Sequence, residues 1–197
     1  MADTAETNVT PISADSKLTD EQKLVQETAR EFAHNDIAPT LVEEEKNHEF
    51  RLDRVARMGE LGFFSCGVPE ELGGTGFGFM ESVLMAEQIA KVSASWRLPF
   101  NMQNLGPALT VAKFGTEAQQ HKFIPGWVAG TQIGFFGMTE PESGSDVASM
   151  KTVARDRGDH WELRGNKIWV SNAVEGDAGL LYVMTDPEKK HRGMSAF

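Results

Sequence analysis

Several residue types and patterns that mark common protein classes are scarce or missing in this sequence. Only one cysteine, Cys66, occurs among the 197 residues, which excludes an intrachain disulfide and a cysteine-based zinc site. Disulfides are typical of oxidising compartments, so we expect a cytoplasmic protein. No run of about 18 apolar residues is present, and no membrane span is predicted. The stretch 1–17 lacks the basic and apolar segments of a signal peptide and is expected to be a disordered lead.

Basic residues are also few. The chain has 19 Lys and Arg against 29 Asp and Glu, and its formal net charge is −10. Binding to nucleic acid or to an anionic membrane surface requires a basic face, so neither partner is expected. The five histidines are scattered without the spacing of metal ligands, and we predict no metal site. An anionic ligand would therefore depend on local donors.

Helical periodicity governs the first two thirds of the chain. Thr19 and Gln22 form a capping box, and apolar residues then recur at helical spacing until a proline interrupts them. A second capping box at Thr116 begins a helix that is expected to reach Trp127. An acidic turn and a glycine-rich loop separate the other predicted helices, which cover 52–61, 79–91 and 96–114. These segments predict an all-α N-terminal domain over 18–130.

The pattern changes at Thr131. Strand-like apolar runs separated by turn signals cover 133–136, 161–163, 167–170, 180–184 and 193–197. The second part is therefore expected to be a β domain over 131–197, which makes the fold class α+β. Its last run reaches the end of the chain without a turn or a polar tail, so this domain is expected to be incomplete.

The most informative stretch is Gly137–Asp146, which places glycines, hydroxyl residues and acids directly after a buried strand. Backbone and hydroxyl donors in such a stretch can approach a flat polar ligand closely. A hydrogen-bonded turn, in which Ser and Asp side chains cap their own backbone, accounts for these residues equally well.

A second stretch, Lys167–Asn172, points in the same direction. Trp169 can stack on a ring and Ser171 can donate a hydrogen bond. A core tryptophan with a satisfied indole is the plainer interpretation. Since both stretches belong to one small β domain, we expect them to form two walls of a single cleft.

These stretches resemble motifs of the acyl-CoA dehydrogenase family, flavoenzymes with an N-terminal helical domain, a β-barrel-like middle domain and a C-terminal helical bundle. Gly137–Asp146 matches the family pattern that ends in Gly-Ser-Asp, and Lys167–Asn172 matches its Lys-x-Trp-x-Ser/Thr-Asn pattern. The resemblance spans roughly 18–197 and includes two further stretches, 62–76 and 113–119. On this resemblance the C-terminal bundle of the family is absent from the chain.

The resemblance implies FAD as the cofactor and an acyl-CoA as the substrate. The residues it assigns to the flavin site are Phe136, Met138, Thr139, Gly144, Ser145, Trp169 and Ser171. The first three are expected on the flavin ring, and the last two would close its other side. Gly144 and Ser145 are expected at the flavin phosphate or at the pantetheine arm of the substrate.

In this family a glutamate base removes the α proton of the acyl group while the β hydrogen passes as a hydride to the flavin. That glutamate usually comes from the C-terminal bundle, so we assign no catalytic residue and expect the chain not to be competent alone. Four acids without a matching role are interpreted as solvated: Glu87, Glu117, Glu140 and Glu142. The resemblance also implies an electron-transfer flavoprotein as acceptor and a homotetramer.

The substrate-reading residue is expected on the helix that shapes the acyl pocket. Arg97 matches the arginine with which glutaryl-CoA dehydrogenases, the branch that looks closest, bind a distal carboxylate, and Asn101 is expected to assist it. Ser145 is a further substrate contact. An arginine that reaches the surface, or pairs with a structural carboxylate, is the alternative. Aryl or alicyclic acyl-CoA thioesters of the benzylsuccinyl-CoA type fit the family nearly as well.

Other functions remain open on the sequence alone. A truncated or split, non-catalytic flavin-binding subunit keeps the fold without the chemistry. Flavin monooxygenases and desulfinases share the helical and β domains as well.

Cys66 follows two phenylalanines and is interpreted as a buried hydrophobic residue, because no neighbouring histidine would activate it as a nucleophile.

Overall fold

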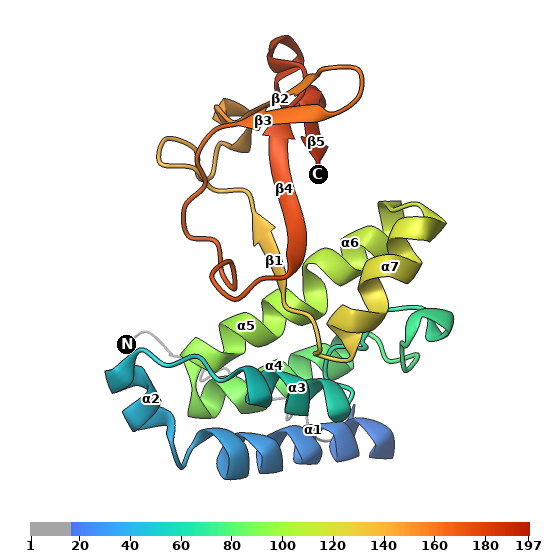
Figure 1. Ribbon diagram of the computed structural model, residues 1–197. Coiled ribbons are helices and arrows are strands. Elements are labelled where there is room, and N and C mark those ends of the chain that lie inside the picture. Colours follow the sequence, from blue (N-terminus) through green and yellow to red (C-terminus); the bar gives the residue numbers. More distant parts are fainter. Residues whose placement is uncertain (1–16) are drawn as a thin grey trace, which may run out of the picture.

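The computed structural model describes residues 17–197 and consists of a helical part followed by a β part, which confirms the α+β class (Figure 1). Except for Lys17, the lead expected to be disordered lies outside the described residues. The helices are α1 (Asp20–Phe32), α2 (Leu41–Asn47), α3 (Leu52–Glu60), α4 (Phe79–Val92), α5 (Ala94–Leu105), α6 (Pro107–Phe114) and α7 (Glu117–Val128). The strands are β1 (Gly134–Gly137), β2 (Val153–Asp156), β3 (Trp161–Arg164), β4 (Ala178–Met184) and β5 (Met194–Ala196). Within the described range, no helix combines the length and the apolar character that a bilayer crossing requires.

Local signals set most helix ends. The capping boxes at Thr19 and Thr116 are both formed, and each satisfies two backbone or side-chain donors at its helix terminus. After α3, Gly62 adopts a left-handed φ of 73°, and the next residue, Phe63, donates its N–H to Met58 O at 3.0 Å. Glycine tolerates this conformation without strain, so the predicted end of the helix is confirmed.

The prediction of one helix over 96–114 is wrong, because the segment is divided into α5 and α6. Pro107 has no N–H with which to continue α5, and it occupies the first position of α6, where none is needed. A Cβ atom at Gly106 would lie 2.5 Å from Met102 O, so the close turn between the helices requires glycine. The apolar periodicity continues across the break and concealed it.

The acidic turn predicted after the first helix is also wrong, since these residues form α2. Glu44 on α2 is buried and accepts hydrogen bonds from Arg54 Nη1 and Nη2 on α3 at 2.5 and 2.7 Å. The guanidinium of Arg54 in turn lies 4.5 Å from the ring centre of Trp96 on α5. A tertiary contact thus fixes α2, although its sequence reads as a solvated acidic run.

The β part is a five-stranded mixed sheet in the order β1-β4-β2-β3, with β5 also paired to β4. β4 is the central strand, parallel to β1 through its first half and antiparallel to β5 through its second half. β2 was not predicted as a strand and forms an antiparallel hairpin with β3. The expected strand over 167–170 is not formed, because Trp169 has a left-handed φ of 57° that a strand cannot accommodate.

A buried glutamine connects the two parts. Gln103 on α5 donates from Nε2 to Trp127 O at 2.8 Å and to Gln132 O at 2.7 Å, and its Oε1 accepts from Gly134 N at 2.7 Å. The side-chain amide therefore fastens α5 to the end of α7 and to the first residue of β1. Through this contact the helical part holds the strand that leads into the Gly137–Asp146 stretch.

Candidate functional site

The two stretches singled out in the sequence lie side by side in the structure. Ile168 N donates to Thr139 O at 2.9 Å, and Asn172 Nδ2 donates to Gly134 O at 3.1 Å. Lys167–Asn172 therefore runs along β1 and the residues that follow it, bonded at both ends. Two regions separated by about thirty positions in the chain are thus hydrogen-bonded to each other.

Lys167 and Glu140 form a buried ion pair between the two stretches. Lys167 Nζ lies 2.7 Å from Glu140 Oε1, and the other Glu140 oxygen accepts from Lys151 N at 2.5 Å. Burial by itself would raise the pKa of the Glu140 carboxyl, but the hydrogen bonds from Lys167 and the backbone of Lys151 and Thr152 lower the pKa to about 2. The interpretation of Glu140 as a solvated acid is thus wrong, whereas the other three acids of that group are exposed: Glu87, Glu117 and Glu142.

The first expected wall begins at the end of β1. Phe136 packs its ring against Tyr182 of β4, with 4.9 Å between the ring centres, and belongs to the apolar cluster beneath the sheet. Met138 and Thr139, which follow the strand, are half-buried. The Thr139 hydroxyl makes no hydrogen bond to any described residue, so one donor of this wall is available to a ligand.

The second expected wall contains the most exposed tryptophan of the described chain. Trp169 is 86% exposed. A tryptophan in the core of a domain would instead lose most of its accessible surface. Ser171, two residues later, is half-buried, and its hydroxyl also makes no hydrogen bond within residues 17–197. The plain interpretation of Trp169 as a core residue is therefore wrong.

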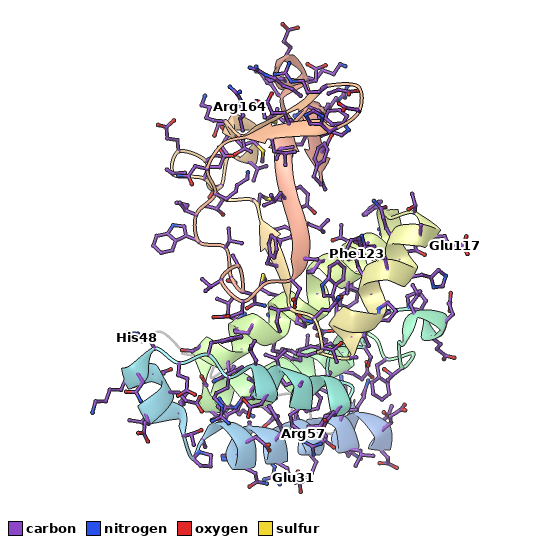
Figure 2. The ribbon with its side chains drawn as sticks, viewed as in Figure 1. Glu31, His48, Arg57, Glu117, Phe123 and Arg164 are labelled. Carbon is purple, nitrogen blue, oxygen red and sulfur yellow. The ribbon has the colours of Figure 1, made fainter. Side chains whose placement is uncertain are left out.

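Ser171 opens onto a groove of about 570 Å³ between the β part and the helical part. Figure 2 labels His48 at its α2 side. The lining residues come from the segment after α2, from the first half of α5 and from the loop before β4: His48, Phe50, Ser95, Leu98, Pro99 and Val170–Glu175. The volume lies within the range of small-molecule sites, and the lining is largely apolar.

The second half of the Gly137–Asp146 stretch is only partly capped by its own side chains and by Ser149. Ser143 Oγ and Ser149 Oγ both donate to Asp146 O, at 2.9 and 2.8 Å, as a self-capping turn requires. Ser145 is exposed, and its hydroxyl has no partner among the described residues. A Cβ atom at Gly144 would meet nothing within 4 Å, so the chain itself gives no steric reason for glycine there.

Arg97 and Asn101 lie one turn apart on α5, and both are half-buried. No carboxylate of residues 17–197 lies within 4.0 Å of the Arg97 guanidinium, so its pairing with a described structural acid is excluded. The Asn101 amide makes no hydrogen bond there either. Their neighbours Leu98 and Pro99 line the groove, whereas Arg97 and Asn101 do not.

Sequence reasoning missed the residues that hold this arrangement together. Lys167 and Glu140 stand inside the two motifs, but neither was assigned a role, and Gln103 carried no signal beyond its helical position. A lysine and a glutamate at fixed places in adjoining motifs could have suggested a pair. In the described part of the chain, no cluster of His, Cys, Asp and Glu could hold a metal ion.

Comparison with known proteins identifies relatives of the whole described chain. It is 39% identical to a glutaryl-CoA dehydrogenase of Desulfococcus multivorans, over 93% of this chain and 48% of that protein. It is 35% identical to the mitochondrial short-chain specific acyl-CoA dehydrogenase of Rattus norvegicus, over 92% of this chain and 44% of that protein. The chain thus spans about half the length of the curated relatives it matches.

Solved structures of related proteins share this fold. A glutaryl-coenzyme A dehydrogenase in complex with glutaryl-CoA superposes with a TM-score of 0.88 at 39% identity, over 91% of this chain and 46% of that chain. An acyl-CoA dehydrogenase of Bacillus anthracis complexed with FAD gives a TM-score of 0.83 at 30% identity, over 92% and 31% of the two chains.

Family models locate the same relationship within the chain. The acyl-CoA dehydrogenase N-terminal domain matches residues 19–131, and the acyl-CoA dehydrogenase middle domain matches residues 135–197. The first match covers the helical part, and the second covers the sheet with both motif stretches. Together with the joined walls described above, these matches establish that the chain belongs to the acyl-CoA dehydrogenase family.

Proposed function

We propose that this chain forms the flavin-binding and substrate-facing walls of an FAD-dependent dehydrogenase that oxidises the α,β bond of an acyl-CoA thioester. The observation that carries the proposal is the junction of the two motif stretches. They are bonded to each other through Ile168 and Thr139, and they leave free hydroxyl donors next to an exposed tryptophan. A rigid surface of that kind suits a planar ring with a polar edge.

The residues present fit a bound flavin. Thr139 and Ser171 offer hydroxyl donors to the polar edge of the ring, and Trp169 offers a flat apolar face, with Phe136 and Met138 completing the first wall. When bound, FAD supplies the acceptor for the hydride that leaves the β carbon. The unpartnered hydroxyls and the exposed indole support this assignment, because each remains available to a ligand.

The phosphates of FAD and of CoA are anionic, whereas the chain has a net charge of −10. The chain as a whole repels anions, so these phosphates depend on local hydrogen-bond donors. We assign Gly144 and Ser145 to a phosphate or to the pantetheine arm. Their exposure and the open space at the Gly144 Cα support the assignment.

We assign no base among the described carboxylates. Glu140 is held ionised in its ion pair, with a pKa of about 2, and is a poor proton acceptor at neutral pH. The curated relatives are about twice as long as this chain, and we expect the glutamate base in the part of such a protein beyond the matched range. An electron-transfer flavoprotein as acceptor and a homotetramer follow from the family resemblance, and a cytoplasmic location follows from the single cysteine. All three remain part of this proposal.

For the acyl group we propose a dicarboxylic thioester such as glutaryl-CoA, with Arg97 as the reader of the distal carboxylate and Asn101 beside it. A half-buried guanidinium without a described carboxylate partner supports this role, because an arginine in that state is stabilised by an incoming anion. The 39% identity to a glutaryl-CoA dehydrogenase points the same way. The 35% identity to short-chain enzymes favours a monocarboxylic acyl group as the second candidate.

The visible absorption spectrum of the purified chain, recorded before and after addition of FAD and then of glutaryl-CoA, tests the proposal. A bound flavin spectrum that glutaryl-CoA perturbs is the expected result. Bleaching in the same sample would require a base within the chain and contradict our assignment of the base. A chain that leaves the spectrum of free FAD unchanged would refute the proposed cofactor site.

Exchange of Arg97 separates the two candidate substrates. Arg97→Met should weaken glutaryl-CoA binding about tenfold to a hundredfold, the size expected for hydrogen bonds to a charged group, and should spare butyryl-CoA. Calorimetric titration of the flavin-loaded chain with both thioesters measures this. Arg57→Met, which removes an exposed arginine paired with Glu60, is the matched control and should change neither affinity. Equal loss of both thioesters in Arg97→Met would make Arg97 structural.

A further inference from the structure

The Lys167–Glu140 pair connects both expected flavin walls, yet neither side chain belongs to the set assigned to the flavin. Only 10% of the Lys167 side chain and 3% of the Glu140 side chain are exposed. Lys167 Nζ also donates to Met138 O at 3.0 Å, directly before Thr139. The Lys167 ammonium therefore contacts the backbone of the first wall. The Lys167 backbone itself lies two residues before Trp169 of the second wall.

Glu140 is fixed from its other side. Its two oxygens accept from Lys151 N at 2.5 Å and from Thr152 N at 3.0 Å, which lie just before β2. The carboxylate thus anchors Lys167 to the sheet, so that the pair cannot shift without breaking backbone hydrogen bonds. This buried pair and the Ile168 N–H bond to Thr139 O together set the distance between the end of β1 and the start of the second stretch.

The second wall needs such an anchor, because its functional side chains are not packed. Trp169 is 86% exposed and has a left-handed φ of 57°, a conformation that a bulky residue rarely adopts without external support. The contacts that fix the segment lie on either side of it. Before Trp169 they are the Lys167 pair and the Ile168 N–H bond to Thr139 O, and after it the Asn172 amide bond to Gly134 O.

Stability alone is a weak reason for a buried pair of this kind. The cost of removing two charges from water largely cancels their attraction, and apolar substitutes of similar volume often serve as well. What an apolar pair cannot do is fix one geometry through four directed hydrogen bonds. The position of the pair between the two stretches, rather than its strength, is the feature that needs an explanation.

We propose that Lys167 and Glu140 are positioning residues, which hold Thr139 on one wall and Trp169 and Ser171 on the other at the separation that the flavin ring requires. This inference rests on the proposed function. Lys167 and Glu140, which are not assigned to the flavin itself, would keep the site in its binding geometry before the ligand arrives. Pre-organisation of this kind lowers the cost of binding rather than adding a contact.

The test compares the double variant Lys167→Gln/Glu140→Gln with the wild-type chain. The neutral pair retains polar atoms at both positions and avoids leaving a single buried charge, which in Lys167→Met alone could prevent folding. The expected result is at least a tenfold loss of FAD affinity, measured by quenching of flavin fluorescence. Hydrogen exchange of the Ile168 amide, which donates to Thr139 O, is measured without FAD and is expected to accelerate at least tenfold. The single variant Lys167→Arg, which keeps the positive charge, should retain both properties in part.

The buried pair of Glu44 and Arg54 supplies the matched control, because it has the same chemistry and lies among the helices. The double variant Glu44→Gln/Arg54→Gln should lower the midpoint of urea unfolding without changing FAD affinity or exchange of the Ile168 amide. If both double variants lose FAD affinity to the same extent, or if exchange of the Ile168 amide is unchanged in the Lys167 and Glu140 variant, the positioning role is refuted. If the wild-type chain itself binds no FAD, the proposed function fails, and the exchange data alone decide whether the pair fixes the segment.

Discussion

Acid should destabilise the helical part of this protein through one carboxylate, Glu44. Hydrogen bonds from Arg54 outweigh the effect of burial and lower the pKa of Glu44 to about 2, against an ordinary value of 4.5. The pKa in the folded chain is thus below that in the unfolded chain, so folding favours the ionised form. This contribution to stability is fully present above pH 4.5 and is lost as the pH falls from there through 2.

The size of the effect follows from the two pKa values. Each pH unit between them corresponds to about 1.4 kcal/mol, so the ionised Glu44 contributes about 3 kcal/mol to the free energy of unfolding at neutral pH. About 2 kcal/mol of this is lost by about pH 3, where Glu44 is mostly protonated in the unfolded chain but still mostly ionised in the folded chain. Since domains are stabilised by only about 5 to 15 kcal/mol in total, one residue should dominate the acid response of its region.

Urea unfolding of the wild type and of Glu44→Gln, at about pH 6 and about pH 3, measures this. The glutamine keeps the shape of the side chain but does not titrate. The wild type should lose about 2 kcal/mol more than the variant between the two pH values, although the variant is less stable at both. Glu60→Gln, which removes an exposed partner of Arg57, should behave as the wild type. Parallel losses in wild type and Glu44→Gln would refute the reasoning.

Three further outcomes are expected. Burial raises the pKa of the Cys66 thiol to about 12, so Ellman's reagent should react with it only after unfolding in urea; rapid labelling of the native chain would contradict this. A Cβ atom at Gly74 would lie 1.7 Å from Val68 O, so Gly74→Ala should lower the melting temperature by several degrees, whereas Gly144→Ala should leave it unchanged and weaken only FAD binding. Thr139→Val should weaken FAD binding by about 1 to 3 kcal/mol in a fluorescence titration while Thr139→Ser retains it, and wild-type affinity in the valine variant would remove Thr139 from the site.

Local signals predicted the elements whose ends depend on neighbouring residues. The capping boxes at Thr19 and Thr116 and the terminating Gly62 act within one helical turn, so the sequence specifies them directly. The order of a helical part and a β part follows from the change of periodicity near Thr131. The two motif stretches also stood out, because their glycines and hydroxyl residues are unusual directly after an apolar strand.

Errors arose where a distant contact overrides the local pattern. The residues around Glu44 resemble a solvated acidic turn until Arg54 and Trp96 are brought against them. Likewise, Lys167–Val170 has the β-branched and aromatic residues typical of a strand, but the Lys167 ammonium binds Glu140 and the backbone is left-handed at Trp169. Burial of a charge depends on its partner, which lies ten positions away for Glu44 and 27 positions away for Lys167, beyond the reach of a local pattern.

The sequence by itself determined the fold class, the family and the residue types of the candidate site, because these depend on periodicity and on short motifs. Only the tertiary structure decided how the site is held together. Through Gln103, α5 is fixed to the start of β1, and Lys167 with Glu140 fixes the second stretch to the first. Such pairings are set by where the chain returns in space, and hydrogen bonds between distant residues leave no periodic trace in the sequence.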